Sequence, residues 1–196
     1  MLEGKTIERP FLYGLVLVLT VILVTMQWRI YTARSSWTMN EGPEIIGKTL
    51  RPLMQHSFKI HTGATIALDS IIPEDNPGLL IFLHTECEYC QLDAPLWRLL
   101  MQRTKITGVT DETDLEAIAQ FLLDHNLNFP IIIDVEGVLS EHLNVRDTPV
   151  KLAISSDLRV LQVWDGWTTR SSGPSEIGSL LTMYGIEPDE LPTVNE

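Results

Sequence analysis

A short apolar segment followed at once by two cysteines constrains the fold of this chain more than any other part of its sequence. Residues 79–83, Leu-Leu-Ile-Phe-Leu, form an uninterrupted apolar run, which is typical of a central strand covered on both faces. Cys87 and Cys90 follow this run, and apolar residues then recur at helical spacing as far as Arg103. The sequence therefore predicts a buried strand, a Cys-x-x-Cys turn and a helix, in that order.

The predicted position of the cysteines at the start of a helix has a chemical consequence. Free backbone N–H groups and the helix dipole favour negative charge at a helix N-terminus, so a thiol placed there ionises more readily. Cys87 is the expected nucleophile, and Cys90, one turn further in, is expected to resolve the mixed disulfide by attacking it. Two intervening residues let the helical turn bring both sulfurs within bonding distance.

The remaining elements are predicted from apolar periodicity and turn residues. A hairpin is expected over 58–68, around a Thr-Gly turn. Further strands are expected over 106–109, 131–133, 150–154 and 160–164, and further helices over 114–125 and 175–184. Alternating strands and helices closed by a hairpin and a helix predict an α/β sandwich with a central mixed sheet.

An uncharged apolar stretch precedes this globular part. Residues 11–28 come close to the roughly 20 apolar residues that a helix needs to cross the hydrocarbon core of a bilayer. A cleaved signal peptide is the alternative, but its apolar core would be shorter, about 7–15 residues. We therefore expect a membrane anchor over 11–28 that contacts lipid. Its flanking Lys and Arg residues are balanced, so the positive-inside rule does not fix its orientation.

Composition narrows the classes of partner and of site. The chain has a net charge of −12, and its acidic residues are concentrated after the apolar stretch. An acidic surface argues against nucleic-acid binding because binding to phosphates requires positive charge. The chain has 2 cysteines, too few for a scaffold held by several disulfides. A zinc site would need four ligands, and His84 is the only evident third one. A structural disulfide and an inert thiol pair also remain open.

Residues 80–95, Leu-Ile-Phe-Leu-His-Thr-Glu-Cys-Glu-Tyr-Cys-Gln-Leu-Asp-Ala-Pro, resemble the active-site stretch of the thioredoxin superfamily. They are most similar to the membrane-anchored TlpA/ResA-like thiol–disulfide oxidoreductases, and Asp93 and Pro95 stand where that family has an acidic residue and a proline. The resemblance extends over about 58–184. It includes Asp-Thr-Pro at 147–149, where the superfamily keeps a cis-proline that faces the active site.

The resemblance implies a thioredoxin-like three-layer sandwich and a redox-active disulfide between Cys87 and Cys90. It implies that Asp93, if buried, shuttles protons for Cys90; the alternative is an exposed acid favoured by the helix dipole. Thr148 and Pro149 would bind an extended substrate segment. Neither a cofactor nor a metal is implied.

The expected organisation runs from an N-terminal tail to an acidic C-terminal tail. The parts are the tail over 1–10, the transmembrane anchor over 11–28, a linker over 29–56, the thioredoxin-like domain over 57–185 and the acidic tail over 186–196. The domain is expected on the extracytoplasmic (periplasmic) side, because a tethered redox pair has disulfide-containing clients there.

The expected function is a membrane-tethered oxidoreductase that reduces or isomerises disulfides of extracytoplasmic client proteins, recharged by a membrane or extracytoplasmic thiol donor. Glu86 and Glu88 flank Cys87, whereas the family usually has an aromatic residue just before the first cysteine. Negative charge nearby disfavours a thiolate. This departure favours a reducing pair of modest reactivity. It also leaves open a redox-silent docking subunit and, less favoured, a metallochaperone using His84. The Pro-x-x-x-Thr-x-x-Cys pattern of peroxiredoxins is absent before Cys87.

Overall fold

The computed structural model describes residues 45–71, 77–167 and 174–187. The chain divides into two compact units, 1–40 and 41–196, and the described residues all belong to the second. The N-terminal tail and the anchor predicted over 11–28 lie outside them. Within the described ranges, no helix has both the length and the apolar character to cross a membrane.

A five-stranded mixed sheet forms the centre of the described unit, in the order β5-β4-β3-β6-β7. Strands β3, β4 and β5 are parallel, whereas β6 is antiparallel to both β3 and β7. The strands are β3 (Gly78–Phe82), β4 (Ile106–Thr110), β5 (Ile131–Ile133), β6 (Val150–Ile154) and β7 (Val160–Asp165). Every residue of β3, β4 and β6 is buried, and for β3 the apolar run at 79–83 predicted this.

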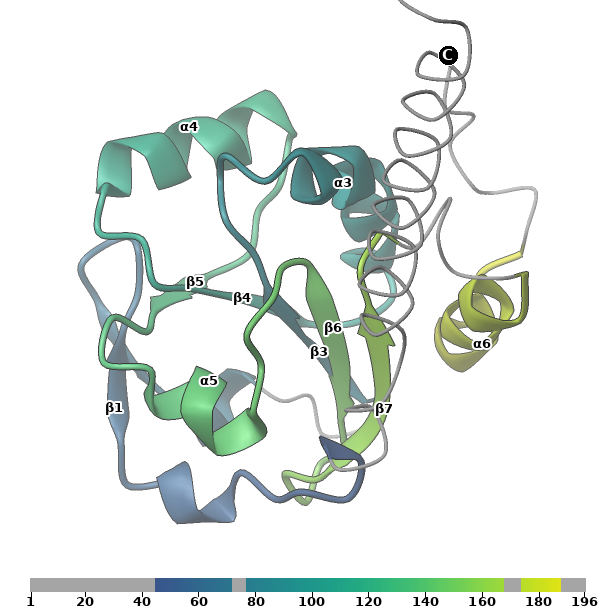
Figure 1. Ribbon diagram of the computed structural model, residues 1–196, viewed down its shortest axis with the longest axis horizontal. Helices are drawn as coiled ribbons and strands as arrows, with labels where there is room; N and C mark the ends of the chain where they lie inside the picture. Colours follow the sequence, from purple (N-terminus) through teal and green to yellow (C-terminus); the bar gives the residue numbers. More distant parts are fainter. Residues whose placement is uncertain (1–44, 72–76, 168–173, 188–196) are drawn as a thin grey trace, which may run out of the picture. The chain divides into compact units, whose positions relative to one another are not determined.

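Helices cover one face of the sheet, and a hairpin and a short helix cover the other (Figure 1). The first layer contains α3 (Glu88–Leu100), α4 (Leu115–Asp124) and α6 (Pro174–Tyr184). The second contains α5 (Val138–Leu143), the hairpin of β1 (Ser57–Lys59) and β2 (Thr65–Ala67), and the 3₁₀ turns Arg51–Leu53 and Leu68–Ile71. This arrangement confirms the predicted α/β sandwich around a mixed sheet.

The folded unit begins before the boundary predicted at residue 57. Ile45, Leu50 and Leu53 are buried in the core on the hairpin side of the sheet, and the Gly47 N–H donates to the Val160 carbonyl at 2.8 Å. Residues 45–56 are thus part of the domain, not of a linker. The sequence suggested a connecting segment because this stretch is rich in polar residues and contains Gly47 and Pro52.

The short helix α5 was not predicted, and local hydrogen bonds explain its existence. The buried carboxylate of Asp134 accepts the Leu139 N–H at 3.1 Å and the Ser140 N–H at 2.9 Å, which caps the first turn. Gly137 and Asn144 at its two ends both adopt the left-handed conformation. With only two turns, α5 is too short to produce a recognisable apolar period.

Candidate active site

The register of the sheet brings three distant segments together at one edge. Phe82, the last residue of β3, pairs with Val150, the first residue of the antiparallel β6, and with Val109 near the end of the parallel β4. The segments after β3, before β6 and after β4 therefore leave the sheet at the same edge. Both cysteines follow β3, so this edge is the candidate redox site.

Cys87 lies at the N-cap of α3 with its side chain partly exposed. Its sulfur accepts the backbone N–H of Cys90 at 3.4 Å. Its thiol donates to the backbone carbonyl of Thr148, with 3.5 Å between sulfur and oxygen. An accessible sulfur that receives a first-turn N–H is placed where a helix stabilises negative charge.

Cys90 is fully buried one turn behind Cys87, and both cysteines are free thiols in the structure. Burial raises the pKa of the Cys90 thiol far above its ordinary value, and the hydrogen bond with Cys87 raises this pKa further. At neutral pH Cys90 is therefore protonated until a base removes its proton. The two thiols therefore differ: the thiol of Cys87 is accessible, whereas the thiol of Cys90 is buried and protonated.

Asp93 lies one turn after Cys90 on α3, and its side chain is fully buried. Its carboxylate accepts from the ammonium of Lys151 on β6, with 2.5 Å between Nζ and Oδ2. Lys151 is itself fully buried and also donates to the Gly166 carbonyl at 2.6 Å. The burial of Asp93 that proton shuttling would require is present, and a buried cation accompanies its carboxyl group.

A partly buried carboxylate fixes the loop between β3 and Cys87. Glu112, which follows β4, accepts the Thr85 N–H at 2.9 Å and the Thr85 hydroxyl at 2.6 Å. Nδ1 of His84 lies 3.4 Å from the same carboxylate and accepts the Glu86 N–H at 3.3 Å. Charge-assisted hydrogen bonds of this kind are the stronger ones in proteins. Glu112, just after β4, therefore fixes the position of the residues between β3 and Cys87.

The rim of the site combines an aromatic stack with a cis-proline. Tyr89, between the cysteines, is 54% exposed and stacks on Trp167, with 6.2 Å between the ring centroids. The Thr148–Pro149 peptide bond is cis, as the resemblance predicted. The carbonyl of Thr148, which precedes Pro149, contacts the accessible sulfur.

The structure brings all the predicted site residues to this one edge: Cys87, Cys90, Asp93, Thr148 and Pro149. Sequence reasoning missed Lys151, Glu112 and Trp167. A lysine inside an apolar strand was the one available signal for Lys151, whereas nothing in the sequence marks the other two. Over the ranges that the structure describes, no group of three or more His, Cys, Asp or Glu side chains is arranged to hold a metal ion.

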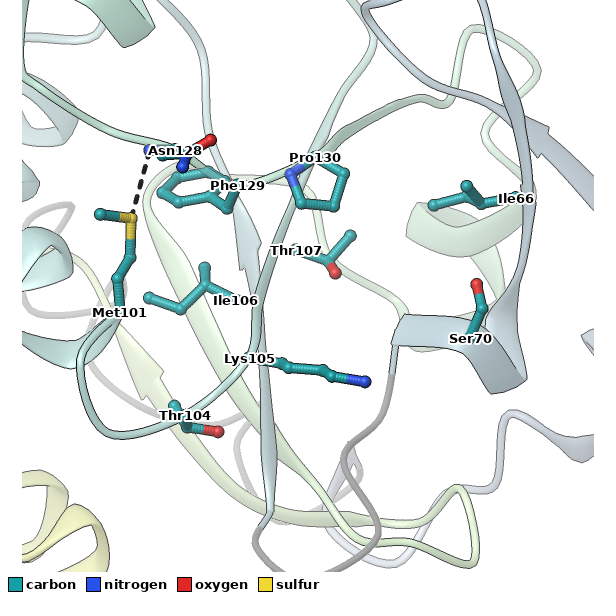
Figure 2. Close-up of a pocket in the computed structure, with 10 residues that line it drawn as sticks. All are labelled: Ile66, Ser70, Met101, Thr104, Lys105, Ile106, Thr107, Asn128, Phe129 and Pro130. Atoms are coloured by element: carbon teal, nitrogen blue, oxygen red, sulfur yellow. Dashed lines mark hydrogen bonds between the residues drawn. The ribbon is translucent and has the colours of Figure 1, made fainter.

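A cavity of about 350 Å³ lies at the opposite edge of the sheet. Figure 2 shows its lining, which comes from the start of β4 at Ile106 and Thr107, from Phe129 and Pro130 before β5, and from Ile66 on the hairpin. None of the predicted site residues lines it. The cavity is separate from the thiol chemistry.

Comparison with known families agrees with this geometry. Residues 52–169 match the AhpC/TSA family. Thiol-disulfide oxidoreductase ResA from Bacillus thuringiensis subsp. konkukian (strain 97-27) is 30% identical over 106 residues, which are 50% of this chain and 61% of the relative. The match therefore spans less than two thirds of that relative's length.

Solved structures share the fold at low sequence identity. A secreted disulfide oxidoreductase of Mycobacterium tuberculosis, homologous to E. coli DsbE, has a TM-score of 0.54 and 22% identity, covering 67% of this chain and 97% of its own. Peroxiredoxin Q of Xanthomonas campestris has a TM-score of 0.55 and 13% identity, covering 74% and 98%. At these identities the likeness establishes the fold, which oxidoreductases and peroxiredoxins share.

Proposed function

Because the chain belongs to the AhpC/TSA family, we propose that it is a thiol–disulfide oxidoreductase that exchanges disulfides of client proteins through Cys87 and Cys90. One observation carries the proposal: an accessible thiol at a helix N-cap stands in front of a fully buried second thiol. Such a pair can attack a disulfide from outside and close its own disulfide from within.

The first step belongs to Cys87. Its thiolate attacks one sulfur of the client disulfide, so a Cys87–client bond forms and the client S–S bond breaks. The other client sulfur leaves as a thiolate and takes a proton from solvent. The N-terminus of α3 and the N–H of Cys90, 3.4 Å from the sulfur, stabilise the attacking thiolate.

The second step belongs to Cys90. Its thiol transfers a proton to the Asp93 carboxylate, and the new thiolate attacks the Cys87 sulfur. The Cys87–Cys90 bond forms, the Cys87–client bond breaks, and the second client sulfur leaves reduced. Two electrons pass from the dithiol to the client disulfide, and an external thiol donor must return two to restart the cycle.

Thr148 and Pro149 provide the client-binding edge in this proposal. The Thr148 carbonyl already accepts a hydrogen bond from Cys87. An extended client segment bound beside Thr148 would therefore place its disulfide next to the Cys87 sulfur. The exposed ring of Tyr89, backed by Trp167, gives the client an apolar contact at the same place.

The location of the reaction is also part of the proposal. The uncharged stretch 11–28 would tether the domain to a bilayer, with the thiols on the extracytoplasmic side, where disulfide-containing clients occur. The expected reaction is the reduction or isomerisation of client disulfides.

Trapping a mixed disulfide tests the proposal. The Cys90→Ser variant of the full chain, mixed with a peptide that contains one disulfide, should accumulate a covalent adduct at Cys87, visible by mass spectrometry and lost on reduction. The Cys87→Ser variant is the matched control and should form none. Failure of Cys90→Ser to form the adduct would instead support a docking subunit that uses this fold without redox chemistry.

A further inference from the structure

Lys151 is a charged residue on an apolar face of the sheet. It pairs across β6 with Ile81 on β3 and with Trp164 on β7, and both of these belong to the core beneath α3. Its side chain is fully buried, with Nζ 2.5 Å from the Asp93 carboxylate and 2.6 Å from the Gly166 carbonyl. Two short hydrogen bonds thus hold the ammonium between α3 and the end of β7.

Stability alone is a poor reason for such a pair. Burying two charges costs several kcal/mol each, and replacing a buried ion pair with apolar residues is often neutral or stabilising. The position of the pair supplies a different reason. Asp93 is three residues after Cys90 on α3, so the two share one helical face, and Lys151 contacts Asp93 from the strand that follows Pro149.

We propose that Lys151 is a positioning residue of the exchange reaction: it keeps the Asp93 carboxylate ionised and fixed beside the turn that carries Cys90. The proposal rests on the proposed function. Without the ammonium, a carboxyl group in a dry core prefers its protonated form, and a protonated acid cannot accept the proton of Cys90. Lys151 would act on the reaction only through Asp93.

The charged groups around Lys151 are consistent with this role. The pKa of Lys151 lies below its ordinary value because burial outweighs the opposing charges of Asp93 and Cys90 on α3 and of Asp165 on β7. Cys87 is the further titratable group that acts on Cys90.

The test uses 5,5′-dithiobis(2-nitrobenzoate) as the disulfide substrate, mixed in equal amount with the reduced full chain. Attack by Cys87 releases one coloured thiolate, and attack by Cys90 on the Cys87 adduct releases the second. In Lys151→Met the first phase should keep its rate. The second phase should be at least about tenfold slower at pH 7, with its pH midpoint raised by about one unit or more, since a contacting charge moves a carboxyl pKa by about 1–3 units.

Matched variants separate this role from a structural one. Lys151→Arg retains the charge and should retain the wild-type pH midpoint. Lys151→Gln removes the charge but keeps an N–H donor, so it should move the midpoint as Lys151→Met does, and it replaces that variant if the latter fails to fold. An unchanged midpoint in the folded, charge-free variant, or equal slowing at every pH, would overturn the inference. Absence of the second phase in wild type would instead contradict the proposed function.

Discussion

At the scale of single residues, the inequality of the two thiols governs the chemistry. Cys87 is partly exposed at the helix N-cap, whereas Cys90 is fully buried with its pKa raised by burial. A buried thiol that stays protonated does not react with outside disulfides. It becomes a nucleophile only when a mixed disulfide stands in front of it and a base takes its proton.

The raised pKa of Cys90 makes the stability of the reduced protein depend on pH. The unfolded chain loses this proton near the ordinary value of 9.0, while the folded chain retains it, so the contribution is fully present below pH 9 and is lost as pH rises above it. With a reductant present, the free energy of unfolding of wild type relative to Cys90→Ala should fall between pH 9 and 11, by up to about 1.4 kcal/mol per unit. Urea denaturation measures this difference. A difference that does not change with pH would show that Cys90 titrates normally in the folded state.

Single residues differ in how far the sequence reveals them. Cys87, Cys90 and Asp93 lie within one short motif, so their spacing and the family resemblance suffice to find them. Lys151 lies 58 residues from Asp93, and on a hairpin strand a lysine ordinarily points to solvent. Its burial depends on the register of β6 with β3, which is a tertiary property.

At the scale of elements, the β3–turn–α3 unit and the strands around it were predictable because each has a strong local pattern. Asp114 caps α4 by accepting the N–H groups of Glu116 and Ala117, as an acid before an apolar period indicates. The segment 45–56 and helix α5 were not predicted, because Gly47 and Pro52 indicate a loop and α5 is only six residues long. Packing against the completed sheet, not a local period, decides their structure.

The tight spacing at the centre of β4 provides a test at this scale. A Cβ added at Gly108 would meet three side-chain atoms, Cγ1 of Ile131 at 2.9 Å, Cε2 of Phe129 at 3.1 Å and Cδ2 of Leu83 at 3.2 Å. We expect Gly108→Ala to lower the free energy of unfolding by about 1–3 kcal/mol, because overpacking forces neighbouring side chains to move. Urea denaturation checks this value.

Gly178 on α6 offers the matched control for that substitution. Among the described residues, no atom outside the backbone of α6 itself lies within 4 Å of a Cβ added there, and alanine is the better helix former by about 1 kcal/mol. Gly178→Ala should therefore leave the stability unchanged or increase it. Equal effects of the two substitutions would contradict the packing described for β4.

At the scale of the whole molecule, the sheet order explains how one short motif becomes a site. Parallel β3 and β4 and antiparallel β6 all present loop segments at one edge. The thiols come from the segment after β3, the Thr148 carbonyl from the segment before β6, and Glu112 from the segment after β4. The sequence alone predicts a mixed sheet but not the order of its strands. Strand order depends on how the segments that connect the strands pack against the sheet.

A redox titration of the full chain tests the central claim most directly. The protein, in detergent micelles, is equilibrated with glutathione or dithiothreitol buffers, and free thiols are counted by the mass shift on alkylation. We predict a reversible two-electron transition at a potential between about −120 and −300 mV, the range of working thiol–disulfide oxidoreductases, and no such transition in Cys87→Ser. Thiols of Cys87 and Cys90 that remain reduced throughout this range would contradict the account.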